Sequence, residues 1–282
     1  MKFFITGLGN LAENLDYIID SVIQADQVGL HGALIPDHYM WGPEVGHRME
    51  NPYNTLEAWT TLTYLAGQTR DIELGTLVTP LPFRHPGVLA KRLSTLDILS
   101  NGRVILGAGA GWSQVEFEGY SIWGDAKYRV DKTIEALEII TRLWTEEEVT
   151  FKSNIYSMNK AVLQPKPIQK PYPKLLFGSQ GKRMLKLTGK YGDICFIPPW
   201  AEEKKDEIKK TVLKSAEKYD RVKDVNFMLG LMSSQNYNSN DIVEKIEESI
   251  AFGATYFTIA FPRETTTESM KDFAKEVLPR YT

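Results

Sequence analysis

The sequence predicts an α/β protein, a (β/α)8 TIM barrel, from three observations. Short apolar runs rich in β-branched residues alternate with longer amphipathic stretches along the whole chain of 282 residues. The apolar runs are nearly continuous, which is typical of parallel strands covered on both faces. Eight repeats of about 30 residues give about 240 residues, near the usual size of such a barrel. We therefore expect one barrel domain over residues 1–282.

The expected strands share this apolar character and follow one another at the spacing of βα units. They are residues 2–6, 32–36, 72–78, 103–108, 174–178, 193–197, 226–232 and 255–260. Helical periodicity is clear at 13–28 and 240–252, and Asn240 is the expected N-cap of the second helix. Gly29 and Gly253 follow these helices, where a left-handed residue often ends a helix.

Two segments are longer than a βα repeat requires. Residues 148–173 come before the fifth strand and carry four prolines, so we expect a small hairpin followed by an extended proline segment. Residues 38–53 form a second excursion after the second strand. Long loops in compact domains usually serve as lids or binding loops. A doubly wound open sheet also alternates strands and helices, but the absence of a convincing first-turn dinucleotide loop favours the barrel.

The composition argues against several function classes. A formal net charge of −3 gives no support for a nucleic-acid-binding surface, which needs clustered cations. No run approaches the roughly 20 apolar residues of a membrane span, and no signal peptide is recognised, so we expect a cytoplasmic protein without a membrane partner. The single cysteine, Cys195, excludes an internal disulfide, and the histidines show no metal-ligand spacing, so no metal site is expected.

The first candidate site residues follow the second strand. Active sites of such barrels lie at the carboxyl ends of the strands. Asp37 and His38 place a carboxylate beside an imidazole at this position. His38 could act as a general acid or base, and Asp37 could orient it or bind a cofactor. The alternative is an aspartate that caps a turn beside a structural histidine.

The loop after the third strand begins at Leu77, Val78 and Thr79 and contains three prolines within seven residues. Proline fixes φ, so this loop is expected to be rigid. Its apolar residues at the barrel mouth suit a flat aromatic ligand. The alternative is a stiff loop whose Arg84 pairs with a surface acid.

A glycine-rich segment, residues 107–112, follows the fourth strand. Gly109 and Gly111 would allow a ligand to approach the backbone closely, and Trp112 could form a wall of the site. The segment matches the dinucleotide fingerprint only weakly, because Trp112 stands where its last glycine is required. Packing of a crowded strand end explains the glycines equally well.

The turn after the fifth strand predicts an anion site. Gly178, Ser179, Gln180 and Gly181 open a helix and are followed by two cations at 182–183. Free N–H groups at a helix start attract anions, and glycines permit a close approach. Barrels more often place a phosphate site after strands seven and eight. The alternative is a glycine turn followed by solvated basic residues.

Several stretches carry a joint resemblance, in order, over about residues 1–200. They are residues 37–39, 74–79, 83–86, 89–97, 102–103, 107–112, 128–129, 163–167 and 178–179. As a set they resemble the luciferase-like monooxygenase superfamily, and most closely its branch that uses the deazaflavin coenzyme F420. The last third of the chain resembles that family only in pattern.

The resemblance implies a (β/α)8 barrel with an insertion before strand five, a homodimer, and coenzyme F420 or FMN bound at the barrel mouth. It implies a non-proline cis peptide at Leu77–Val78 that backs the cofactor ring. It also implies that Asp37 and His38 contact the ring, and it places Arg129 among the cofactor-binding residues.

The resemblance further implies a phosphate-binding turn at Gly178, Ser179 and the amides that follow. Trp112 departs from the sugar-phosphate dehydrogenase members of the family, which carry a glutamate there. This departure weakens the transfer of their acid–base assignment and of their substrate to this chain.

Two redox hypotheses follow. In the main one, a hydride moves between a small organic substrate and the deazaflavin, and His38 takes or gives the accompanying proton. In the other, a separate flavin reductase supplies reduced FMN, which traps oxygen for a monooxygenase reaction. The alternatives outside redox catalysis are a barrel lyase or hydrolase that uses Asp37 and His38 with a lysine or metal, and an idle flavin carrier.

Overall fold

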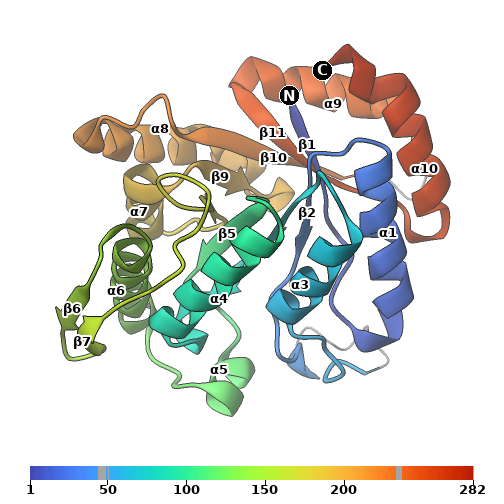
Figure 1. The fold of residues 1–282 in the computed structure, drawn as a ribbon. Helices are drawn as coiled ribbons and strands as arrows, with labels where there is room; N and C mark the ends of the chain where they lie inside the picture. Colours follow the sequence, from blue (N-terminus) through green and yellow to red (C-terminus); the bar gives the residue numbers. More distant parts are fainter. Residues whose placement is uncertain (44–48, 50, 233–236, 282) are drawn as a thin grey trace.

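Eight parallel strands close into a barrel in the computed structural model, which describes residues 1–43, 49, 51–232 and 237–281 (Figure 1). In ring order they are β1 (Lys2–Ile5), β2 (Gly32–Ile35), β3 (Glu73–Thr76), β5 (Val104–Gly109), β8 (Lys174–Phe177), β9 (Ile194–Ile197), β10 (Asn226–Met232) and β11 (Ala254–Ala260), which pairs with β1. The predicted (β/α)8 TIM barrel is confirmed. Each predicted strand is present, with ends that differ by at most two residues.

The third barrel strand differs from its prediction at the carboxyl end. β3 stops at Thr76, the Leu77–Val78 peptide is cis, and a short strand, β4 (Thr79–Pro80), then pairs with β5. The continuous strand expected over 72–78 is therefore wrong beyond residue 76, because the chain bulges into the barrel mouth there before it pairs again. The cis bond implied by the resemblance is confirmed.

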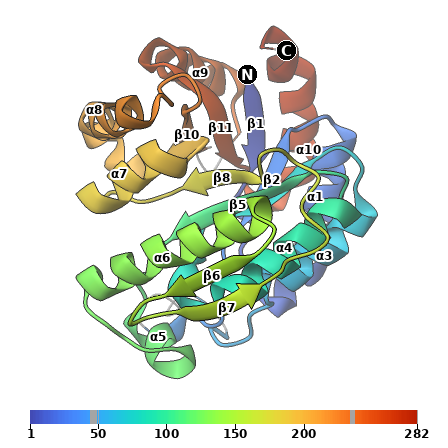
Figure 2. The same cartoon turned by 60° about the vertical axis from the view of Figure 1, so that its left-hand side comes forward.

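The helices surround the barrel (Figures 1 and 2). They are α1 (Leu15–Gln27), α3 (Ala58–Gln68), α4 (Pro86–Leu99), α5 (Gln114–Tyr120), α6 (Ala126–Thr145), α7 (Lys182–Tyr191), α8 (Lys205–Ala216), α9 (Ser239–Phe252) and α10 (Thr266–Asp272), with short 3-10 and π turns between them. Among the described residues, no helix combines the length and apolar character needed to cross a bilayer.

The residues predicted to end or begin helices α1 and α9 can be compared with the structure. Gly29 and Gly253 follow α1 and α9 with φ values of 84° and 98°, which confirms the predicted left-handed positions. Asn240 is not the N-cap of α9. The Asn238 side chain instead accepts N–H bonds from Asn240 and Asp241, because the helix begins at Ser239, earlier than predicted.

The insertion before β8 forms the expected hairpin, in which β6 (Val149–Lys152) pairs antiparallel with β7 (Ser157–Ala161) (Figure 2). A proline segment then returns to the barrel. Buried Asp97 of α4 holds this segment by accepting bonds from the Gln169 backbone N–H at 3.0 Å and its side-chain amide at 2.6 Å. Part of the excursion predicted at 38–53 lies outside the described residues.

The core has two layers. One fills the barrel interior and consists of Phe4, Leu34, Ile105, Leu176, Ile194, Phe196, Met228 and Tyr256. The larger layer lies between the strands and the helices. Leu77 and Val78 pack against the interior layer. The barrel is therefore filled by side chains below its mouth, and space for a ligand is left at the carboxyl ends of the strands.

Candidate active site

A cavity of about 560 Å³ opens at the carboxyl ends of the barrel strands, and residues at or after all eight strands contribute to its wall. Its size is in the range typical of small-molecule sites. Most of the predicted site residues line it: His38, Leu77, Val78, Gly109, Gly111, Trp112, Gly178, Ser179 and Gln180. Asp37, Thr79, Arg129 and Gly181 do not.

The bulge at residues 77–78 requires glycines opposite it. A Cβ atom on Gly109 would lie 2.6 Å from Val78 Cγ2, and one on Gly178 would lie 3.2 Å from Val78 Cγ1. Gly111 has φ of 78°, and a Cβ there would lie 2.4 Å from the Phe117 ring. Packing therefore explains these glycines. The same packing brings bare backbone to the wall of the cavity, so the two interpretations of the glycine segment are compatible.

His38 is held on the wall of the cavity by Glu116 and two indole rings. Its Nδ1 lies 2.8 Å from Glu116 Oε2. The imidazole packs on Trp41, with 4.0 Å between ring centres, and meets Trp112 edge-on at 5.6 Å. A carboxylate at Nδ1 fixes the proton on that nitrogen. Nε2 is therefore the nitrogen that can exchange a proton with a bound molecule.

Glu116 is the site residue that sequence reasoning missed. It is 1% exposed, lies in α5, lines the cavity and also accepts N–H bonds from Tyr39 and Met40. Its position between Val115 and Phe117 was the available signal, since a lone acid between two apolar residues is often buried. No spacing rule links it to His38, which is 78 residues away.

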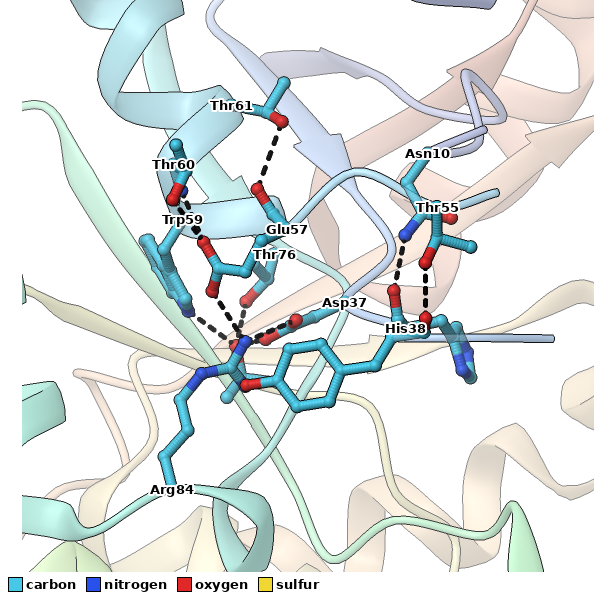
Figure 3. Close-up of polar contacts among 12 residues, drawn as sticks. Asn10, Asp37, His38, Thr55, Glu57, Trp59, Thr60, Thr61, Thr76 and Arg84 are labelled. Atoms are coloured by element: carbon cyan, nitrogen blue, oxygen red, sulfur yellow. Dashed lines mark hydrogen bonds and ion pairs between the residues drawn. The ribbon is translucent and has the colours of Figure 1, made fainter. Parts of the chain in front are cut away.

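Asp37 faces away from His38 and is part of a buried polar network (Figure 3). Its Oδ1 accepts a bond from Arg84 Nη2 at 2.8 Å, and its Oδ2 accepts one from the Thr79 hydroxyl at 2.7 Å. Arg84 Nη2 also lies 2.8 Å from Glu57 Oε1. The structure therefore does not bring Asp37 to His38 or to the cavity. Arg84 therefore pairs with buried Asp37 and half-buried Glu57. The alternative from the sequence, in which Arg84 pairs with a surface acid, is wrong for Asp37.

Burial sets the electrostatics of this network. It raises the pKa of the Asp37 carboxyl above its ordinary value, and the Arg84 guanidinium and the Thr79 hydroxyl oppose the rise. Burial by itself would lower the pKa of Arg84, but the adjoining Asp37 carboxylate outweighs it and raises that pKa. Thr79, fully buried, also accepts a bond from Trp59 Nε1 at 3.0 Å. These residues hold the strand ends together.

Gly181 adjoins the cavity wall, whereas Arg129 packs on aromatic rings that do not line it. The Arg129 guanidinium stacks on Trp123, 3.9 Å from the ring centre, and donates to the Gly124 carbonyl. Gly181 is the N-cap of α7, next to the cavity-lining Gln180. No side chain caps α7, so its first amides are free to bind an anion at the cavity edge.

Comparison with known proteins identifies the family. A family model described as luciferase-like monooxygenase matches residues 1–277. The chain is 29% identical over 269 residues to an F420-dependent glucose-6-phosphate dehydrogenase of Amycolatopsis mediterranei, covering 92% of this chain and 77% of that one. It is 30% identical over 180 residues to the F420-dependent hydroxymycolic acid dehydrogenase of Mycobacterium tuberculosis, covering 63% of this chain and 48% of that one.

A solved structure has the same fold over its whole length. An F420-dependent secondary alcohol dehydrogenase in complex with an F420–acetone adduct superposes with a TM-score of 0.86, covering 100% of this chain and 99% of that one. At 18% identity this likeness shows the fold alone. The barrel and these relatives together define an oxidoreductase. The chain belongs to the luciferase-like monooxygenase family, and the predicted membership is confirmed.

We expect Asp37→Ala to lower the free energy of unfolding by about 3–5 kcal/mol, because it leaves the buried Arg84 guanidinium without a main partner. Urea denaturation followed by circular dichroism measures the change. The control Glu202→Ala breaks an exposed contact with Lys205, and such pairs contribute little. An unchanged unfolding free energy for Asp37→Ala would contradict the structural role of Asp37.

Proposed function

We propose that this protein is an F420-dependent oxidoreductase that moves a hydride between the deazaflavin and a small uncharged alcohol or its ketone. The observation that carries the proposal is the mostly apolar cavity at which all eight strand ends meet, with His38 on its wall. The curated relatives named F420-dependent dehydrogenases support the choice of cofactor.

The cavity residues fit a flat ring with an anionic group at one end. Leu77 and Val78 form an apolar surface, and Gly109 opposite them leaves the backbone bare. These residues would hold the ring. Gly178 and Ser179, together with the free amides at the start of α7, would hold the phosphate.

When bound, the deazaflavin supplies a ring carbon that accepts or returns a hydride. His38 handles the proton. As an alcohol becomes a ketone, Nε2 takes the hydroxyl proton while the hydride leaves the carbinol carbon, and in the reverse direction Nε2 returns that proton. Glu116, bonded to Nδ1, keeps the imidazole oriented and stabilises its protonated form.

The charge of the cavity wall favours an uncharged substrate. Within the described residues, the wall contains no lysine or arginine, and its one carboxylate, that of Glu116, would repel an anion. Trp112 and Trp200 add apolar surface at the mouth, with exposed fractions of 56% and 79%. A sugar phosphate would find no cation on this part of the wall, whereas an apolar alcohol would match it.

The alternative functions, the homodimer and the cytoplasmic location expected from the sequence stay predictions. An FMN-dependent monooxygenase served by a separate flavin reductase is the second candidate, since the two cofactors share ring and phosphate. The described cavity wall offers no lysine for a Schiff-base lyase. The homodimer and the cytoplasmic location stay predictions from the resemblance and the sequence, and light scattering of the purified protein measures the first.

We expect the purified protein to bind coenzyme F420 at least about tenfold more tightly than FMN, measured by fluorescence titration. Ser179→Asp should weaken binding by about tenfold or more, because its carboxylate repels the phosphate. Ser157→Asp in the exposed strand β7 makes the same charge change away from the cavity and should bind normally. Weak and equal binding of both cofactors would contradict the proposal.

We expect His38→Ala to lower kcat about 100-fold or more while the Kd for the cofactor changes by less than about threefold. Glu116→Gln should lower kcat by about tenfold or more with KM little changed, because it removes the charge that stabilises protonated His38. Glu118→Gln, on the exposed face of the same helix, is the matched control. Normal turnover by His38→Ala would remove His38 from the mechanism.

We expect kcat/KM for a neutral secondary alcohol such as cyclohexanol to exceed that for glucose 6-phosphate by about 100-fold or more. The physical reason is the cost of placing a dianion beside a wall without a described cation. Initial rates of cofactor reduction with each substrate measure the ratio. A preference for the sugar phosphate would overturn the proposed substrate class and leave the cofactor assignment standing.

A further inference from the structure

A second hollow, of about 740 Å³, lies outside the barrel and is lined by residues of α7 and α8, with Ile134 of α6 at its edge. Helices α6, α7 and α8 lie on the same side of the barrel (Figure 2). Six of the residues that line it are cationic. They are Arg183, Lys186 and Lys190 from α7, Lys210 and Lys214 from α8, and Lys218 from the turn that follows α8. None of its lining residues is acidic.

The spacing of these residues forms two rows. Lys186 and Lys190 are four residues apart on α7, and Lys210, Lys214 and Lys218 repeat every four residues along α8 and its terminal turn. Residues four apart share one face of a helix. Because both rows line the same hollow, they face each other across it, and Leu187 and Ile134 add apolar surface.

Most of these charges have no neutralising partner. Arg183 pairs with Asp131 of α6, and Lys190 lies over the rings of Tyr191 and Tyr219, at 4.6 and 5.7 Å. The side-chain ammonium groups of four lysines make no ion pair or hydrogen bond with the described residues, namely those of Lys186, Lys210, Lys214 and Lys218.

Two acids of α6 lie near lining cations, and each also contacts another residue. Asp131 contacts both Lys127 and Arg183, and Glu138 lies near Lys190 but also contacts Arg142 at 3.9 Å. In contrast, two lysines of α8 outside the hollow do have partners, since Lys205 pairs with Glu202 and Lys209 donates to the Phe252 carbonyl. Facing cations repel one another, and a bound anion would relieve this repulsion.

We propose that this hollow binds a multivalent anion, a short chain of phosphate or carboxylate groups. Two opposed rows of cations can contact several anionic groups at once, whereas a single phosphate would engage only part of either row. A nucleic acid is the less favoured partner, because the cations line a concave hollow between two helices and the chain has a net charge of −3.

Two sources supply this chemistry. One is a free multivalent anion in solution. The other is the anionic tail of the cofactor, because Gln180 lines the barrel cavity and Arg183, three residues further along, lines this hollow. Only the second source rests on the proposed function.

The first experiment titrates the full chain, without cofactor, with inorganic tripolyphosphate in a calorimeter. We expect one site, a Kd that rises with salt, and a loss of about tenfold or more in Lys210→Glu/Lys214→Glu. Lys223→Glu/Lys271→Glu makes the same charge change at exposed positions outside the hollow and should stay within about twofold. Equal losses in both variants, or none in the first, would overturn the proposal.

Lys210→Gln/Lys214→Gln guards against a folding defect. Tripolyphosphate should raise the Tm of the unmodified protein and raise that of this variant less, while the Tm without ligand stays similar. An equal rise in both proteins would overturn the proposal. A single-stranded oligonucleotide that binds more tightly than tripolyphosphate and is lost in the same variants would replace it with a nucleic-acid site.

The second experiment repeats the titration with saturating coenzyme F420. A drop of about tenfold or more in tripolyphosphate affinity assigns the hollow to the cofactor tail, and unchanged affinity assigns it to a free anion. Failure of the protein to bind any F420 would contradict the proposed function and leave the result of the first experiment intact.

Discussion

The mouth of the barrel depends on the buried contact between the Asp37 carboxylate and the Arg84 guanidinium, completed by the Thr79 hydroxyl. This contact ties the end of β2 to the loop after β3. The next residue after Asp37 is His38, and the residue before Thr79 is Val78, and both of these line the cavity. Anchoring the two polar residues behind the wall therefore fixes the imidazole and the apolar bulge in front of it.

Charge differs between the barrel cavity and the hollow between α7 and α8. The described wall of the barrel cavity carries one imidazole and one carboxylate, which are bonded to each other, and its other side chains are uncharged and mostly apolar. The hollow between α7 and α8 carries cations that largely lack partners. The start of α7 lies between them, with Gln180 on one side and Arg183 on the other. A formal net charge of −3 does not reveal this difference, because composition gives only the sum of the charges and was used only to argue against a nucleic-acid-binding surface.

The fold was predictable because parallel strands buried on both faces leave continuous apolar runs in the sequence. The rule that active sites of such barrels lie at the carboxyl ends of the strands then predicted most of the cavity wall. The same rule could not predict which side chains at a strand end face the cavity and which face away from it. Asp37 and His38 are adjacent, yet the loop turns one inward to Arg84 and the other into the cavity. The role of Glu116 was not predicted because its partner, His38, is 78 residues away in the sequence. The end of β3 at Thr76 was not predicted because an apolar run gives the same sequence pattern whether it continues as a strand or forms a bulge.

The bond between Glu116 and His38 joins the loop after β5 to the loop after β2 across the rim of the barrel. Loops of such barrels are commonly treated as exchangeable modules on a constant scaffold. Here two of them form one structural unit, because replacing the segment that carries α5 would leave the imidazole and the Tyr39 amide without their acceptor. Transplanting specificity onto this scaffold would therefore require both segments to be moved together.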